Sequence, residues 1–402
     1  MRRELPTPHF SEHAKAWILD PQVVFLNHGS YGACPQRVLE YQRHIQEQME
    51  REPLRFMGTE LEPMLDQARI DLAGFLNADH EGLAFVHNAT TAVNAVFRSI
   101  EFQPGDEVLT NNHEYNACNN ALRWVVGRAC GGQVRINTAS VPFPLNSPDE
   151  VVNAILDAVT PKTRLVMISH VTSPTALIFP VERLIRELSS RGIETLIDGA
   201  HAPGMIPLDL KSLAATYYVG NCHKWMCSPK GAGFLYIHDE ARRPQISPVV
   251  ISHGLNSTRT DRSRFRLLFD WTGTDDYTAW LSVPEAIRAV SSMLPGGWPA
   301  VMQANHRKVL AGRDTLLRVL GGNAPAPDSM LGSLATIPLP DAIHAEGQPD
   351  EQLKTLYDEH KVRVPLISWP KHPKRWVRLS AQLYNDPSQY EYAAAVLKQL
   401  LS

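Results

Sequence analysis

The central part of the chain alternates short apolar runs with amphipathic stretches. From Leu83 to about Ile237, runs rich in β-branched residues are separated by segments such as Thr90–Ile100, in which apolar side chains recur at helical spacing. This alternation is typical of a mostly parallel sheet built from βαβ units, so an α/β domain is predicted, with its strands all running the same way. The predicted strands are Leu83–His87, Glu107–Thr110, Gln133–Asn137, Arg164–Ser169, Ile193–Ile197, Thr216–Val219 and Gly233–Ile237.

Two further regions flank this domain. Before it, Val23–Leu26 is predicted to be a short strand, and Pro35 suits the first turn of a helix that runs to about Arg51. After it, Pro284–Met293 is an amphipathic connector, a Pro-Gly-Gly break follows, and Val301–Val319 is predicted to be a helix. We therefore expect an N-terminal arm over residues 1–58, a large domain over 59–284 and a small C-terminal domain over 285–402.

Composition narrows the possible partners. The 402 residues carry 39 Lys+Arg against 42 Asp+Glu, a formal net charge of −3, which provides no basic field for a nucleic acid. With 44% hydrophobic residues the chain is too apolar to be disordered. No run of 18 apolar residues is present, and the segment Met1–Asp20 lacks the apolar region of a signal peptide. We expect a cytoplasmic protein that has neither a nucleic acid nor a membrane as its partner.

The five cysteines form an odd set without a CxxC spacing, which is neither a disulfide framework nor a zinc ribbon. Cys222, His223 and Cys227 lie close in sequence but lack a fourth ligand at zinc spacing, so no metal is predicted. The cysteines are Cys34, Cys118, Cys130, Cys222 and Cys227.

Polar residues follow several predicted strands, at the sheet edge where α/β proteins bind ligands. Asn88–Thr91 opens a helix with small hydroxylated residues, which suits either an anion site or ordinary N-capping. Asn111–Asn116 is an aromatic-rich loop that contains His113 and Tyr115. These loops are the candidate ligand-binding segments.

The next two strands are followed by charged residues. Asp198 comes directly after Ile193–Ile197, and a carboxylate there is costly to bury unless a cation lies nearby. Lys224 follows Thr216–Val219 on a turn with His223 and Trp225, so it is either a desolvated amine with a lowered pKa or an ordinary surface lysine.

The combination of these residues is more specific than its parts. A strand-end Asp198, followed 26 residues later by His223-Lys224 ahead of a Gly-containing strand, resembles the fold-type I pyridoxal-phosphate (PLP) enzymes. More narrowly, the chain resembles the class V aminotransferase family, in its isopenicillin N epimerase-like branch. The segments that carry this resemblance, between Val23 and Asp386, are Phe25–Gly32, His170–Thr175, Asp270–Thr274, Val377–Ser380 and Tyr384-Asn385.

The resemblance implies a large domain with a mostly parallel seven-stranded sheet and a smaller α+β C-terminal domain. It implies PLP as the cofactor and a homodimer with shared active sites. One departure is Ala176, where many relatives carry glycine, and this puts the shape of that loop in question.

The resemblance also implies roles for individual residues. Lys224 would form the internal aldimine and later move the Cα proton, while Asp198 would pair with the pyridinium nitrogen. Arg378 would hold the substrate α-carboxylate through two hydrogen bonds, with Asn27 nearby. Near the phenolic oxygen of the cofactor, the resemblance implies His201 with Thr172 or Ser173. It implies that His113 or Tyr115 stacks on the ring. At the phosphate it implies Ala89, Thr90, Thr91, Asn221 and His223 of the same chain, together with Thr274 of a second subunit.

Several reactions remain open. The resemblance implies chemistry at Cα of an amino acid or small peptide-like substrate through an external aldimine and a quinonoid, which leads to epimerisation, transamination or β-elimination. Epimerisation with two bases would need a proton donor that faces Lys224, and the candidates are His113, Tyr115 or a residue of the neighbouring subunit. A carbon–sulfur β-lyase acting on cysteine conjugates or their sulfoxides, as in ergothioneine synthesis, is the alternative. A cysteine desulfurase needs a mobile cysteine in the C-terminal part, and no cysteine follows Cys227. Epimerase, lyase and aminotransferase therefore stay open, and we expect an isomerase or a lyase rather than a transaminase.

The sequence also bears on a non-catalytic alternative and on the role of a cationic segment. A non-catalytic binding protein on this fold would be expected to lack the lysine or the aspartate, and this chain has both. The cationic segment Arg259–Arg266 suits either a solvated or subunit-contact role or the binding of a second substrate carboxylate.

Overall fold

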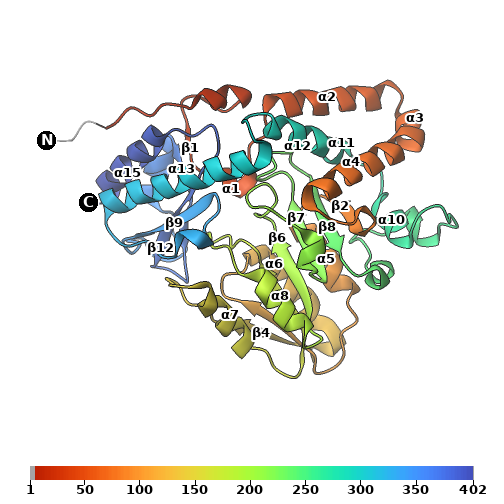
Figure 1. The fold of residues 1–402 in the computed structure, drawn as a ribbon. Helices are drawn as coiled ribbons and strands as arrows, with labels where there is room; N and C mark the ends of the chain where they lie inside the picture. The colour runs from red at the N-terminus through yellow and green to blue at the C-terminus, as the bar shows by residue number, and fades with distance from the viewer. Residues whose placement is uncertain (1–4, 402) are drawn as a thin grey trace.

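The computed structural model describes residues 5–401 and places a seven-stranded sheet at the centre of the molecule (Figure 1). The strand order is β2-β8-β7-β6-β5-β3-β4. This confirms the predicted α/β fold with a mostly parallel seven-stranded sheet. The strands are β2 (Leu83–Val86), β3 (Glu107–Asn111), β4 (Arg135–Ala139), β5 (Thr163–Ser169), β6 (Glu194–Gly199), β7 (Tyr217–Asn221) and β8 (Gly233–Ile237).

One strand runs against the predicted direction. β8 pairs antiparallel with both β7 and β2, whereas β7, β6, β5, β3 and β4 are mutually parallel. The connection from Asn221 to Gly233 is a loop without a helix, and parallel neighbours need a longer crossover that usually contains one. The expectation that all strands run the same way was therefore wrong at β8.

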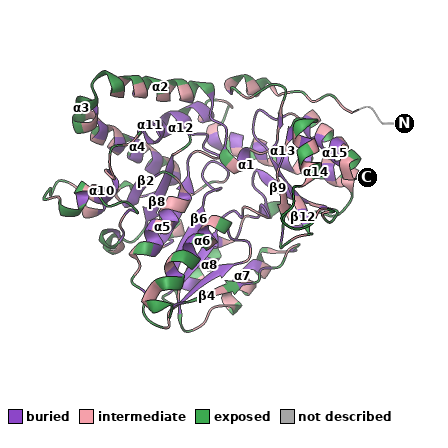
Figure 2. Cartoon of the chain, turned by 180° about the vertical axis from the view of Figure 1, so that it is seen from behind, coloured by how far each residue is buried: buried purple, intermediate pink, exposed green. Residues whose placement is uncertain are grey.

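Helices cover both faces of the sheet. Alternate residues of each strand enter different apolar clusters: Val166 and Ile168 pack on the side of α4 and α8, and Leu165 and Met167 pack on the side of α5 and α6. The central strands are buried, the edge strand β4 is partly exposed, and the helices are buried on one face and exposed on the other (Figure 2). The helices of this part of the chain are α1 (His28–Tyr31), α2 (Gln36–Arg51), α3 (Pro53–Arg55), α4 (Leu61–Leu76), α5 (Ala89–Ser99), α6 (Asn116–Val125), α7 (Pro148–Asp157), α8 (Val181–Ser189), α9 (Leu210–Leu213), α10 (Arg264–Phe269), α11 (Thr278–Leu281) and α12 (Val283–Ser291).

The C-terminal part has its own three-stranded antiparallel sheet in the order β11-β12-β9. The long helix α13 (Gly297–Leu320) packs on β9 and on the last helix (Figure 1). It begins four residues before the predicted start, because Pro299 is tolerated in a first turn. The remaining elements are β9 (Leu334–Leu339), α14 (Glu351–Asp358), β10 (Val362–Arg363), β11 (Leu366–Ser368), β12 (Arg375–Ser380) and α15 (Pro387–Leu401).

The N-terminal segment packs against the C-terminal part of the chain before it continues into α2. Its strand β1 (Val24–Phe25) pairs in parallel with β10. The domain boundaries at residues 58 and 284 stay predictions. Short helical turns complete the fold: η1 (Glu12–Ala16), η2 (Phe56–Glu60), η3 (His80–Gly82), η4 (Val126–Gly131), η5 (Glu240–Gln245), η6 (His253–Asn256) and η7 (Asp328–Met330).

The structure shows how the loop accommodates Ala176, where many relatives carry glycine. Its φ is 62°, a left-handed conformation in which glycine is the usual residue, and its side chain is fully buried. The Ala176 amide still donates to the Thr172 carbonyl at 3.0 Å, so the turn is closed with alanine in place. Within residues 5–401, no helix is long and apolar enough to cross a membrane.

Candidate active site

A cavity of about 550 Å³ lies at the carboxyl ends of β5, β6 and β7. This is the edge at which parallel sheets present ligand-binding loops. The residues that line it are Ser30, Tyr31, Asn88, Ala89, Thr90, Thr91, Asn94, Tyr115, Ser169, Val171, Ser173, Asp198, Ala200, His201, Asn221, His223, Lys224 and Val249.

Lys224 reaches this cavity as a buried amine. Its Nζ lies 3.2 Å from Nε2 of His201, and the indole N–H of Trp225 points to Nδ1 of the same ring at 3.3 Å. An indole only donates, so Nδ1 is the acceptor and the proton of the neutral ring sits on Nε2. The lysine amine is then the acceptor, which requires it to be neutral.

The pKa shifts of Lys224 and His201 both favour their neutral forms, and Lys224 reaches the neutral form above a pH of about 8. Burial lowers the pKa of Lys224 to about 8, the Asp198 charge opposes this effect, and Arg378 adds to it. Burial, followed by the charge of Lys224, lowers the pKa of His201 well below its ordinary value. The site therefore holds a lysine that is easily deprotonated beside a neutral imidazole.

Asp198 ends β6 in an enclosed position, with 3% of its surface exposed. Its Oδ1 accepts from the Ala200 amide at 2.9 Å and its Oδ2 accepts from the Cys118 thiol at 3.2 Å. In the described part of the chain no cationic side chain forms an ion pair with this carboxylate. A buried carboxylate without a counter-charge is costly, so the position suits a ligand that brings a positive group.

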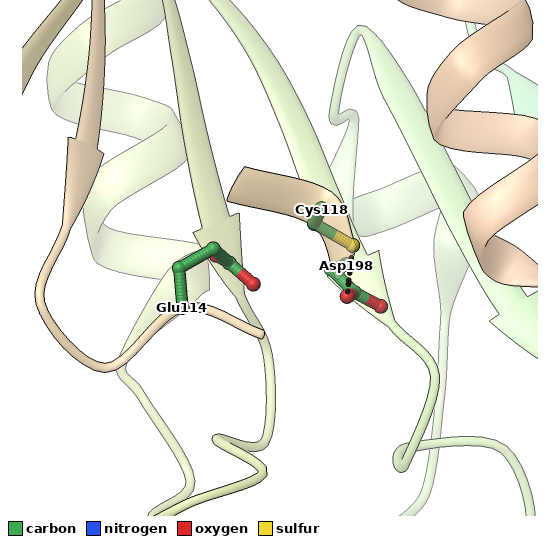
Figure 3. A group of neighbouring side chains, drawn as sticks. All are labelled: Glu114, Cys118 and Asp198. Atoms are coloured by element: carbon green, nitrogen blue, oxygen red, sulfur yellow. Dashed lines mark hydrogen bonds between the residues drawn. The ribbon is translucent and has the colours of Figure 1, made fainter. Parts of the chain in front are cut away.

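A second carboxyl group lies beside Asp198 (Figure 3). Glu114 Oε1 accepts from the Ser169 hydroxyl and from the Tyr115 amide, while Oε2 has no partner. Burial first, and then the Asp198 charge, raises the pKa of Glu114 to about 8, so Glu114 is protonated at neutral pH. The sequence analysis missed this residue, because a glutamate in a polar loop gives no signal of burial.

The helix α5 begins at the other end of the cavity. Asn88 is its N-cap and accepts from the Thr91 amide at 2.9 Å, while Asn221 Oδ1 accepts from the Ala89 amide at 2.8 Å. Asn88 therefore caps α5 in the ordinary way, as one of the two alternatives predicted. Since Ala89, Thr90, Thr91, Asn221 and His223 also line the cavity, the same helix end is open to an anion.

Arg378 closes the site from the small sheet. It lies on β12, is 4% exposed, and donates to Ser173 O at 2.6 Å, Ser173 Oγ at 3.0 Å and Ser30 Oγ at 3.1 Å. Its Nε is buried without a partner, and it forms no ion pair with any described residue. Burial lowers the pKa of Arg378 to about 10, which leaves it charged at neutral pH. An unpaired buried guanidinium suits an incoming carboxylate.

Residues 26–346 match the family described as Aminotransferase class-V. The chain belongs to the class V aminotransferase family. It is 36% identical to an isopenicillin N epimerase of Amycolatopsis lactamdurans over 95% of this chain and 96% of that protein. It is 28% identical to a probable chloroplastic L-cysteine desulfhydrase of Arabidopsis thaliana over 95% of this chain and 82% of that protein.

Solved structures agree in fold. A cystine C–S lyase superposes with a TM-score of 0.75 at 21% identity, covering 94% of this chain and 97% of that one. A cysteine desulfurase of Thermococcus onnurineus superposes with a TM-score of 0.76 at 18% identity, covering 99% of both chains. The predicted family, fold class and cofactor are thus confirmed: this is a PLP-dependent enzyme of the class V family. The uncompensated Asp198 carboxylate and the neutral Lys224 amine fit that cofactor.

The structure brings most of the predicted site residues together, although their individual roles stay predictions. Tyr115 lines the cavity with 45% of its surface exposed, but His113 does not line it. The His113 ring is fully buried against Trp369 and bonded to Thr175 at 2.6 Å. Stacking on the cofactor or catalysis by His113 does not fit this packing, which leaves Tyr115 as the candidate.

Besides Arg378, which contacts the lining residues Ser30 and Ser173, three other predicted residues do not line the cavity. Thr172 is buried and bonded to Thr175, so Ser173 is the member of that pair that faces the site. Asn27 is one step removed, because it accepts from the Ser30 hydroxyl at 2.6 Å and Ser30 contacts Arg378. Thr274 is exposed and does not line the cavity of its own chain.

Arginines of the cationic segment Arg259–Arg266 form ion pairs with carboxylates of the same chain. Arg262 donates to both oxygens of Asp66 on α4, at 2.9 and 2.7 Å, and Arg259 donates to Glu62. Arg266 is paired with Glu81 and Asp270. Arg259 and Arg262 thus hold the segment to α4, and the two roles expected for it stay predictions.

Attachment of PLP to the cofactor-free protein should depend on pH through Lys224. Only the neutral amine attacks an aldehyde, and the lowered pKa means that the rate rises with pH through about 8 and falls as Lys224 is protonated below it. The growth of visible absorbance after mixing with PLP measures this rate. A midpoint near the ordinary lysine value of about 10.4 would contradict the buried, neutral lysine.

Proposed function

We propose that this enzyme moves the proton at Cα of an amino acid or small peptide-like substrate, as an isopenicillin N epimerase-like isomerase. The observation that carries the proposal is that Lys224 lines the cavity while Arg378 lies directly behind it, hydrogen-bonded to Ser30 and Ser173, which also line the cavity. Lys224, whose pKa is lowered to about 8, would be the base, and Arg378, whose Nε has no partner, would bind the carboxylate. The 36% identical relative named isopenicillin N epimerase supports this reaction class.

Each residue has a defined task in this proposal. PLP, when bound, draws electrons from the substrate Cα and so makes its proton removable. Arg378 and Ser173 hold the carboxylate, Lys224 takes the Cα proton on Nζ, and Asp198 retains a proton at the cofactor's ring nitrogen. Inversion needs a second proton donor, and the hydroxyls of Tyr31 and Tyr115, which are 73% and 45% exposed, are its candidates in this chain.

A carbon–sulfur β-lyase is the second candidate. It uses the same proton abstraction but then expels a β-substituent, so it needs no second proton donor. The L-cysteine desulfhydrase among the relatives favours it. The substrates would be cysteine, its conjugates or their sulfoxides.

A cysteine desulfurase is disfavoured by the cysteines themselves. All five lie at or before Cys227, and Cys34, Cys118, Cys222 and Cys227 are buried. Burial raises the pKa of the Cys34 thiol to about 12, which opposes formation of the reactive thiolate.

One experiment separates these reactions. The PLP-loaded enzyme is incubated in D₂O with amino acids, cysteine conjugates and their sulfoxides, while Cα deuteration, chirality, pyruvate and 2-oxo acids are followed. Deuteration with inversion and without pyruvate is expected. Pyruvate without inversion would assign the lyase, a 2-oxo acid with loss of substrate nitrogen would assign the transaminase, and no turnover of any substrate would overturn the proposal.

We also propose that the enzyme is a cytoplasmic homodimer in which Thr274 approaches the phosphate site of the other copy. Thr274 is exposed, and Val249 at the rim of the cavity continues into the exposed apolar residues Val250 and Ile251. An apolar rim beside an open site supports burial by a second copy. Sedimentation at low protein concentration would show a dimer, and a monomer with full activity would contradict the shared site.

A further inference from the structure

The chain segment 24–32 connects the small sheet to the turn that carries Lys224. On the small-sheet side, the Ser380 amide donates to Leu26 O at 2.9 Å and the Gly29 amide donates to Ser380 Oγ at 3.0 Å. At its other end Gly32 has a φ of 71°, and a Cβ there would lie 2.1 Å from His223 O. The segment is therefore fixed to the small sheet and pressed against the lysine turn.

His28 stands in the middle of this segment, and its ring is fully buried. Nε2 lies 3.0 Å from the main-chain carbonyl of Lys224, and Nδ1 lies 3.0 Å from the hydroxyl of Tyr384. A carbonyl only accepts, so Nε2 carries the proton and Nδ1 accepts from the Tyr384 O–H. The Lys224 carbonyl therefore selects the Nε2–H tautomer of His28, and the Tyr384 hydroxyl supports it by donating to Nδ1.

The imidazole is neutral and has no competing strong partner. Burial lowers the pKa of His28 to about 3. The other polar atoms near Nε2 are Cys227 Sγ at 3.8 Å and Gln382 Nε2 at 3.5 Å, both longer than the bond to Lys224 O. The direction of the chain of hydrogen bonds is thus from Tyr384 to His28 to Lys224.

A second set of contacts joins the same histidine to the lysine tip. The His28 and Trp225 rings pack with centroids 4.9 Å apart, and Trp225 donates to His201, whose Nε2 faces Lys224 Nζ. His28 is therefore in contact with both the main chain of Lys224 and the residue that orients its side-chain partner.

We propose that Tyr384 and His28 are positioning residues that hold the Lys224 turn and couple it to the small sheet that carries Arg378. The proposal rests on the role of Lys224 in the proposed function. In the absence of the Tyr384 hydroxyl, Nδ1 loses its donor, and only the bond to Lys224 O still favours the proton on Nε2. The other tautomer turns a lone pair toward Lys224 O and loses that bond. Small displacements of a reacting group are costly, since about 1 Å can lower a rate by about 10²-fold.

The test is Tyr384→Phe, which removes one hydroxyl and keeps the ring. Two readouts are followed: competitive reductive methylation of Lys224 against pH in the cofactor-free protein, and the kinetics of Cα exchange in the loaded enzyme. We expect the methylation midpoint of Lys224 to shift and kcat to fall by about 10-fold with KM little changed. Asp198, Cys118 and Arg378, whose charges act on Lys224, are unchanged in this variant.

The matched control is Tyr390→Phe. Tyr390 is 2% exposed in the same part of the chain and also loses one hydrogen bond, from its hydroxyl to Ser380 O at 3.1 Å. Both variants are expected to lose similar thermal stability, but only Tyr384→Phe should change the two readouts. Equal changes in both variants, or no change in Tyr384→Phe, would overturn the positioning role.

A second pair of variants covers the case in which Tyr384→Phe does not fold. His28→Gln keeps an N–H that reaches Lys224 O, whereas the shorter His28→Asn does not. We expect His28→Gln to keep a larger fraction of kcat and a smaller methylation shift than His28→Asn. Equal loss in the two variants would overturn the inference, whereas failure of the proposed function would show instead as unchanged Cα exchange in Lys224→Ala.

Discussion

Lys224→Ala is expected to abolish covalent attachment of PLP and to lower the rate of Cα proton exchange by about 10²-fold to 10⁴-fold. In the proposed function Lys224 supplies both the amine that bonds the cofactor and the base at Cα, and no other lysine lines the cavity among residues 5–401. Borohydride treatment followed by mass spectrometry of the peptide that contains position 224 measures the attachment. Exchange in D₂O measures the base.

The control for this variant is Lys211→Ala. Lys211 is exposed on α9 and away from the cavity, so its loss should change neither readout. Borohydride-stable attachment in Lys224→Ala at wild-type level would show that another amine bonds the cofactor. That result would remove the basis of the proposed function.

Arg378→Ala is expected to lower kcat/KM for α-amino acids by about 10-fold to 150-fold, chiefly through KM. Charge-assisted hydrogen bonds contribute about 1.5–3 kcal/mol each, and the variant removes the site's unpaired guanidinium. Steady-state kinetics across a substrate series measures the effect. Arg378→Lys keeps the charge but cannot form the two-pronged contact, so it should fall between the wild type and Arg378→Ala.

Substrates provide the control for Arg378. An amine analogue that lacks the α-carboxylate should bind wild type and Arg378→Ala with similar affinity, because it makes no use of the guanidinium. If the amino acid and its amine analogue lost affinity equally, Arg378 would be a structural residue. The carboxylate site would then lie elsewhere in the cavity.

The sequence predicted the central sheet closely because its strands are apolar and β-branched. Gly233–Ile237 was predicted with the bounds that the structure shows, and Arg164–Ser169 differs by one residue at one end. The direction of β8 was not predictable from such a run, because its residues are buried in either direction. Only the absence of a helix between Asn221 and Gly233 carried that information.

The site could be predicted only where chain position determined it. Asp198 and Lys224 end neighbouring strands, so pairing of β6 with β7 brings them to one edge. The choice between His113 and Tyr115 depended on long-range packing, because Trp369 comes from a distant part of the chain and covers His113. Glu114 and the ion pairs of Arg262 were invisible for the same reason, since their partners are distant in sequence.

The pairing of β1 with β10 has a consequence for biosynthesis. The first strand finds its partner only near the end of the chain, and His28 finds Tyr384 only just before α15. Domains fold as they emerge from the ribosome, so the central sheet can form while these partners are still unmade. The Lys224 turn, against which residues 24–32 are pressed, is then completed by contacts between residues 356 positions apart, and such long-range contacts form slowly.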